Sequence, residues 1–180
     1  MEEFVPAPPP VVPYDRAWAT SYKKEAPLLG IALAPVPHWV EHIGSTAVPG
    51  LPAKPVIDLM VGIVDYGRFH VIRQALGTLG YIWDPAAERD EPARKIFRKG
   101  PPDLSQLRTH HLHLAVKDGD YWRRILAFRD QLRQDPSAAA EYADVKADLL
   151  RVCGDDSRAY TRGKRDVVKK IERIAGVDVP

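Results

Sequence analysis

The segment VEHIGSTAVPGLPAKPVIDLMVGI, residues Val40–Ile63, decides the fold prediction. It places a Gly-Ser turn directly after one apolar run and an aspartate inside a second, which is rich in β-branched residues. Such runs, bounded by glycine and proline, predict two β-strands at 36–43 and 56–64. Because alternate side chains of a strand share one face, Asp58 points away from the face that carries the apolar residues into the core. A carboxylate placed there needs a cation, hydrogen-bond donors or water.

The turn between these strands has the composition of an anion-binding site. Gly44 permits a tight turn and a close approach of the backbone to a ligand, and the amides of Ser45 and Thr46 can donate to phosphate oxygens. If the turn and Asp58 share a cleft, the carboxylate would hold Mg²⁺, which bridges to the phosphates. Lys54 would then screen phosphate charge. The residues leave open a purely structural alternative, in which the aspartate bonds to the turn and the lysine is solvated.

The rest of the chain predicts an α+β domain. Strand patterns occur mostly in the middle of the chain and helical patterns mostly at the end, which favours this class over a repeating βαβ array. Further strands are expected at 81–83, 94–98 and 110–116, and helices at about 15–30, 65–79, 120–132, 136–153 and from 157 onward. Within 180 residues we expect a Pro-rich extended arm, 1–13, and one domain, 14–176.

Composition narrows the function classes. Hydrophobic residues make up 45% and charged residues 28% of the chain, as in ordinary globular proteins. A net charge of +2 argues against a dedicated nucleic-acid binder, and no apolar run approaches the roughly 20 residues needed to span a membrane. The start, MEEFVPAPPPVVP, lacks the features of a secretory signal, so a cytoplasmic location is expected. Cys153 is the single cysteine, and oligomeric state is not predicted.

Two histidines of the strand at 110–116 are further candidates. Apolar residues alternate with them and are expected to face the core, which leaves His111 and His113 together on the opposite face. If this strand neighbours that of Asp58, one imidazole would complete a metal site or act as a base, since imidazole titrates near neutral pH. A surface strand with polar side chains is the alternative.

The basic stretch RKIFRKG, residues 94–100, suggests an anion contact. Arg94 and Arg98 are candidates for binding a triphosphate or a polyanionic acceptor, since a guanidinium group binds phosphate in bidentate fashion. A solvated strand edge is equally compatible, because lysine commonly guards such edges against pairing.

Several segments of the sequence together resemble the pattern of a known family. EHIGSTAVPGLPAKPVIDLMV resembles the central signature of the GrpB family, which is assigned to the nucleotidyltransferase superfold of the DNA polymerase beta type. YDRAWATSYKKE, HLHLAV, FRDQLRQDPSAAAEYADVKADL and YTRGKRDVVKKI also resemble the family's pattern, so the likeness covers most of residues 13–174. The resemblance implies a mixed central β-sheet of the nucleotidyltransferase type flanked by helices, with a helical C-terminal third. It further implies phosphate binding at Gly44 and Ser45, and Asp58 as a metal ligand; Tyr160 and Lys164 match the late motif and are expected near the cleft rim.

One position departs from this pattern. Members of the superfold transfer a nucleotidyl group from a nucleoside triphosphate to an acceptor hydroxyl with two metal ions, held by two acids two residues apart. Met60 occupies the second position here, and a thioether does not replace a hard oxygen ligand. Either other residues substitute for the second acid, or catalysis has been lost.

We therefore expect a metal-dependent, nucleotidyltransferase-like protein that binds a nucleoside triphosphate and acts on an unknown acceptor. Asp58 and His113 are the catalytic candidates, and these two with His111 are the metal candidates. The metal would be Mg²⁺ or Mn²⁺, with a transition metal as the alternative. The alternative function is a non-catalytic nucleotide- or anion-binding module, which Met60 favours.

Overall fold

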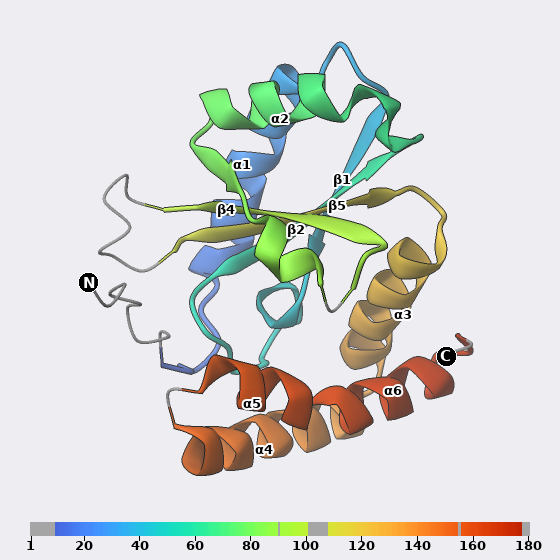
Figure 1. Cartoon of the computed structure of the whole chain (residues 1–180). Coiled ribbons are helices and arrows are strands. Elements are labelled where there is room, and N and C mark those ends of the chain that lie inside the picture. The colour runs from blue at the N-terminus through green and yellow to red at the C-terminus, as the bar shows by residue number, and fades with distance from the viewer. Residues whose placement is uncertain (1–9, 90, 101–107, 155, 178–180) are drawn as a thin grey trace.

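A five-stranded mixed sheet forms the centre of the chain (Figure 1). The computed structural model describes residues 10–89, 91–100, 108–154 and 156–177. The strands are β1 (His38–Ile43), β2 (Ile57–Ile63), β3 (Tyr81–Trp83), β4 (Arg94–Lys99) and β5 (His110–Val116), in the order β1-β2-β5-β4-β3. β2 and β5 run parallel, and every other neighbouring pair is antiparallel. The predicted α+β class with a mixed central sheet is confirmed.

One face of the sheet packs against α1 (Ala17–Ala32) and α2 (Phe69–Thr78). The odd-numbered residues of β2 and the leucines of β5 enter this core, as strand alternation predicts; its fully buried members include Leu29, Leu59, Val61, Ile63, Ile72, Leu76, Phe97, Leu112 and Leu114. Aspartates start both helical segments: Asp15 Oδ1 accepts the Ala17 amide at 2.8 Å, and Asp65 Oδ1 accepts the Gly67 amide at 2.6 Å before the short η2 turn (Tyr66–Arg68).

The other face of the sheet is covered partly by α3 (Asp120–Gln134). Here Met60 of β2 is fully buried in a cluster with Ile43, Ala115, Tyr121 and Trp122. Gly62 allows this packing, since an ideal Cβ at its position would lie 2.6 Å from the Trp122 ring. On this face of β2, the apolar packing thus reaches Met60, and Asp58 lies two residues before it.

The C-terminal helices form a layer beside the sheet (Figure 1). Asp135 Oδ1 accepts the amides of Ser137 and Ala138 at 2.9 and 3.1 Å and so begins α4 (Pro136–Cys153), as predicted. The single helix expected from residue 157 is wrong, because α5 (Ser157–Gly163) and α6 (Arg165–Ile174) are separate. Gly163, a poor helix former, lies where a Cβ would come 2.3 Å from Leu149 Cδ2 of α4, so close packing favours the break there.

The segment between β1 and β2 is fixed at both ends. It begins with a 3₁₀ turn, η1 (Ser45–Ala47), and its apolar residues Val48 and Leu51 pack into a cluster formed by α3, α4 and α6. Ala53 pairs with Val12 through two backbone hydrogen bonds of 2.9 and 3.0 Å. The last residues of the expected Pro-rich arm are thus attached to this loop, and residues 1–9 lie outside the described part of the chain. No described helix is long and apolar enough to cross a bilayer.

Candidate functional site

The structure brings the Gly44 turn and Asp58 into contact. Ile43, the last residue of β1, pairs with Asp58, so the turn starts directly beside the carboxylate. Gly44 has φ 69° and ψ −172°, a conformation that only glycine adopts readily. An ideal Cβ at this position would lie 2.5 Å from Asp58 Oδ2. Glycine is therefore required here both by backbone conformation and by the lack of space.

The turn presents backbone donors more readily than side chains. The amides of Ala47 and Val48 donate to the carbonyls of Gly44 and Ser45. The amides of Ser45 and Thr46 come earlier in the 3₁₀ turn, before its first internal hydrogen bond, so the turn itself does not use them. The Thr46 side chain is buried, and its hydroxyl bonds to the His42 ring Nε2 at 3.0 Å. Any contact of Thr46 with a ligand would therefore use its amide.

A buried lysine reaches the same turn from α4. Lys146 Nζ donates to Ser45 Oγ at 3.2 Å and to the Pro52 carbonyl at 2.5 Å. Burial lowers its pKa to about 7, and the charge of Lys164 adds to the effect. Tyr142, one helical turn earlier, also hydrogen-bonds to Ser45. The sequence prediction missed Lys146, although its spacing from Ala138 and Tyr142 on the apolar side of the helix could have revealed it.

Two further lysines contact the aromatic ring of Tyr160 in α5 (Ser157–Gly163). Lys54 Nζ is 4.7 Å and Lys164 Nζ is 4.5 Å from the ring centroid, within the range of a cation–π contact. Burial lowers the pKa of Lys164 to about 8, against the opposing charge of Asp58, and burial also lowers the pKa of Lys54. Lys54, Lys146 and Lys164, called here the lysine cluster, thus gather positive charge around the turn and Asp58.

The parallel pairing of β2 and β5 sets the two candidate histidines beside Asp58 and Met60. His111 pairs with Asp58, and its Nδ1 lies 3.5 Å from Asp58 Oδ1. Burial raises the pKa of the Asp58 carboxyl, but the His111 hydrogen bond, with nearby positive charge that includes Lys164, outweighs it, so the pKa lies below its ordinary value. With its side chain 30% exposed, Asp58 is ionised and accessible to a ligand.

His113 is held differently. Its Nδ1 is 2.5 Å from the Tyr121 hydroxyl of α3. Burial, together with the charge of Arg94, lowers its pKa to about 3. An imidazole with so low a pKa is neutral at physiological pH and is a weak general base, because efficient bases have pKa values near the working pH. The geometry therefore suits His113 better as a neutral hydrogen-bonding partner than as a base.

The two candidate arginines of β4 share the face of Asp58 but lie at opposite ends of the strand: Arg98 is level with His111 and Asp58, and Arg94 with Ala115 and Gly62. Arg98, which pairs with His111 across the sheet, forms an ion pair with Asp84 at 2.6 Å. Arg94 lies over the Tyr121 ring at 5.7 Å, and its buried Nη1 has no hydrogen-bond partner among the described residues. A ligand anion is the kind of acceptor that this atom lacks.

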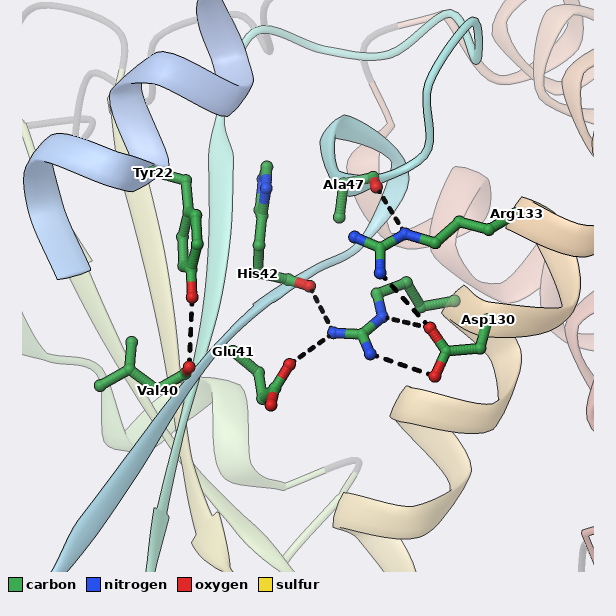
Figure 2. A network of polar contacts seen from close by, with 8 residues as sticks. Tyr22, Val40, Glu41, His42, Ala47, Asp130 and Arg133 are labelled. Atoms are coloured by element: carbon green, nitrogen blue, oxygen red, sulfur yellow. Dashed lines mark hydrogen bonds and ion pairs between the residues drawn. The ribbon is translucent and has the colours of Figure 1, made fainter.

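The residues next to the turn on β1 point to opposite faces of the sheet (Figure 2). His42 stacks on Tyr22 of α1 at 4.7 Å, and burial lowers its pKa to about 4. Glu41 lies on the face of Asp58, but Arg129 holds its carboxylate at 2.7 Å. Neither side chain is free for a ligand, because His42 is engaged by Tyr22 and Thr46 and Glu41 by Arg129.

The family model described as GrpB protein matches residues 8–173. The chain belongs to the GrpB family. A UPF0157 protein of Pseudomonas aeruginosa is 40% identical over 163 residues, which cover 89% of this chain and 65% of that protein. The crystal structure of the conserved protein GrpB from Enterococcus faecalis matches with a TM-score of 0.80 at 35% identity, over 92% of this chain and 96% of that one. The chain thus spans about two thirds of the length of the Pseudomonas relative.

A structure of low sequence identity also resembles the chain in fold. A chain of the GLD-2/RNP-8 complex matches with a TM-score of 0.56 at 14% identity, over 87% of this chain and 60% of that one. Such a likeness concerns the fold alone. The predicted nucleotidyltransferase-type fold is confirmed, together with the family.

The GrpB chain offers few side chains to a metal. Among the described residues, no group of three His, Cys, Asp or Glu side chains is arranged to hold an ion. Asp58 and His111 could supply two ligands, whereas His113 is engaged by Tyr121. Met60, at the position of the second acid, is fully buried under aromatic residues of α3. These residues fit one hard cation that completes its coordination with phosphate and water, and they do not fit a second.

Proposed function

We propose that the chain binds a nucleoside triphosphate together with one divalent cation. The observation that carries this proposal is the contact between the Gly44 backbone and Asp58, with the lysine cluster around the same turn. A site with one carboxylate and three lysines is complementary in charge to a metal–polyphosphate complex, whose cation matches the carboxylate and whose phosphates match the lysines. A neutral ligand would match neither.

Each group has a role in this proposal. The amides of Ser45 and Thr46 donate to phosphate oxygens, and the lysine cluster balances their charge. Asp58 is the principal metal ligand, with His111 beside it. A bound Mg²⁺ or Mn²⁺ would neutralise the phosphates and orient them for in-line attack by the hydroxyl of an acceptor.

A second candidate function is a nucleotide-binding module without catalysis. The observation that favours it is the complete burial of Met60 beneath Tyr121 and Trp122, which fills the position of the second acid. The low pKa of His113 adds to it, because this ring is then a weak general base. Nucleotidyl transfer, the first candidate, requires that a single metal ion at Asp58 supports the reaction.

Calorimetric titration with each nucleoside triphosphate, with Mg²⁺ or Mn²⁺ and without metal, tests the binding proposal. Binding should require the metal and should be lost in Asp58→Asn, which keeps the shape of the side chain but removes its charge. Asp120→Asn is the matched control, because this residue is exposed and pairs with Arg123 one helical turn along α3. Equal affinities in the two variants would refute the proposed metal site.

Release of pyrophosphate separates the two functions. Wild-type protein that binds a nucleoside triphosphate and releases pyrophosphate on addition of an acceptor is a transferase. Binding without release, over a panel of protein, nucleotide and small hydroxyl acceptors, supports the non-catalytic module. Failure to bind any nucleoside triphosphate in the presence of either metal would refute both.

A further inference from the structure

Two arginines of α3 contact the backbone on both sides of the Gly44 turn. Arg129 Nη1 donates to the His42 carbonyl at 3.0 Å, and Arg133 Nε donates to the Ala47 carbonyl at 2.9 Å (Figure 2). These carbonyls belong to the residues that flank Gly44, Ser45 and Thr46. The two arginines thus hold the start and the end of the segment whose amides face the candidate ligand.

A shared carboxylate fixes both arginines. Asp130 accepts Arg129 Nε at 2.8 Å and Nη2 at 3.1 Å, a bidentate pairing, and its Oδ1 also lies 3.4 Å from Arg133 Nη1. Glu41 holds Arg129 Nη1 at 2.7 Å, and the Arg129 side chain is only 9% exposed. Two like charges one helical turn apart would otherwise repel each other, so the carboxylates are what allow both guanidinium groups to point at the turn.

The opposite side of the turn is held by α1. Tyr22 donates its hydroxyl to the Val40 carbonyl at 3.1 Å and stacks on the ring of His42, which bonds to Thr46. β1 lies at the edge of the sheet, where its outward carbonyls have no neighbouring strand. Side chains of α1 and α3 thus replace the missing strand and restrain the turn from two directions.

We propose that Arg129 and Arg133 are positioning residues for the anion-binding turn. They set the distance between the turn amides and Asp58, on the adjacent strand, without touching the ligand. This matters because an error of a few tenths of an ångström weakens hydrogen bonds from a rigid turn to a bound anion. The expected effect on ligand affinity rests on the proposed function, whereas the restraint of the turn by the two arginines does not.

The test uses Arg133, whose side chain is 37% exposed, so its loss is tolerated more easily than that of buried Arg129. Arg133→Met keeps the aliphatic packing and removes the donor, and Arg133→Lys restores one donor. Arg123→Met is the matched control on the same helix, since Arg123 is exposed and pairs with exposed Asp120. Hydrogen exchange of the peptide covering residues 42–50 is measured in each variant, together with the affinity for ATP and Mg²⁺.

Arg133→Met should speed exchange in this peptide alone and weaken ATP binding about tenfold, as expected for a lost charge-assisted hydrogen bond. Arg133→Lys should recover most of both effects, and Arg123→Met should show neither. Unchanged exchange at residues 42–50 would overturn the proposal, and so would faster exchange spread over the whole chain, which indicates a general loss of stability. Local exchange changes in a protein that binds no nucleoside triphosphate with either metal would uphold the positioning role and refute the proposed function alone.

Discussion

Substitution of Gly44 by alanine tests the geometry on which the candidate site depends. The backbone at this position, φ 69° and ψ −172°, lies in a region essentially restricted to glycine, which costs another residue about 1–3 kcal/mol. The new Cβ would also lie 2.5 Å from Asp58 Oδ2, and both residues are held by paired strands. Overpacking of this kind costs about 1–3 kcal/mol more. We therefore expect Gly44→Ala to lower the free energy of unfolding by about 2–6 kcal/mol.

Gly50 provides a matched control in the same loop. It also has a positive φ, 81°, but no atom lies within 4 Å of an ideal Cβ there. Gly50→Ala should therefore show the backbone cost alone, about 1–2 kcal/mol. The difference between the two variants in urea unfolding combines the contact with Asp58 and any difference in backbone cost, which a double substitution separates.

A double substitution identifies the colliding atoms. Asp58→Ala removes the carboxylate oxygen at 2.5 Å and leaves only the Cβ at 3.0 Å, so Gly44→Ala should cost clearly less in that background than in the wild type. Equal costs of Gly44→Ala and Gly50→Ala, or an unchanged cost after removal of the carboxylate, would show that the turn does not press on Asp58. The site as described would then be refuted.

Three pH-dependent outcomes follow from the buried charges. Burial lowers the pKa of Lys146 from 10.5 to about 7, so between these pH values the unfolded chain binds more protons than the folded one and the free energy of unfolding rises with pH. Lys146→Met should flatten this rise in urea titrations. Lys170→Met is the control and should leave it unchanged, because Lys170 is exposed and pairs with Glu141. His42 and His113, with pKa values lowered to about 4 and about 3, should destabilise the fold as pH falls below 6.5, and His113→Gln should reduce that slope; an unchanged slope would argue against a buried neutral ring. Affinity for ATP with Mg²⁺ should decline as pH rises through about 7 and 8, where Lys146 and Lys164 lose their protons, and a flat profile in calorimetry would contradict the lysine cluster as a phosphate site.

Local patterns determined much of this protein. The alternation along Ile57–Ile63 assigned each residue of β2 to a face, and three of the predicted helices begin beside aspartates that accept backbone amides there: Asp15, Asp65 and Asp135. The Gly-Ser turn and Asp58 were assigned to two consecutive strands, and their sharing of a cleft was the condition on which the predicted site depended. These assignments depend on steric and hydrogen-bonding rules within a few residues, so the sequence alone suffices for them.

Only the tertiary structure decided which distant residues complete the site. Alternation cannot fix strand order, so the parallel pairing that sets His111 against Asp58 follows from packing of the whole sheet. Lys146 is 101 residues from Ser45 along the chain, and its lowered pKa arises from burial that no local pattern specifies. Arg129 and Arg133 also read as ordinary charges of an amphipathic helix, yet the packing of α3 against the sheet edge directs them to the turn. The reason is common to all three: burial and contact across layers depend on the complete fold, because they are set by residues far apart in the chain.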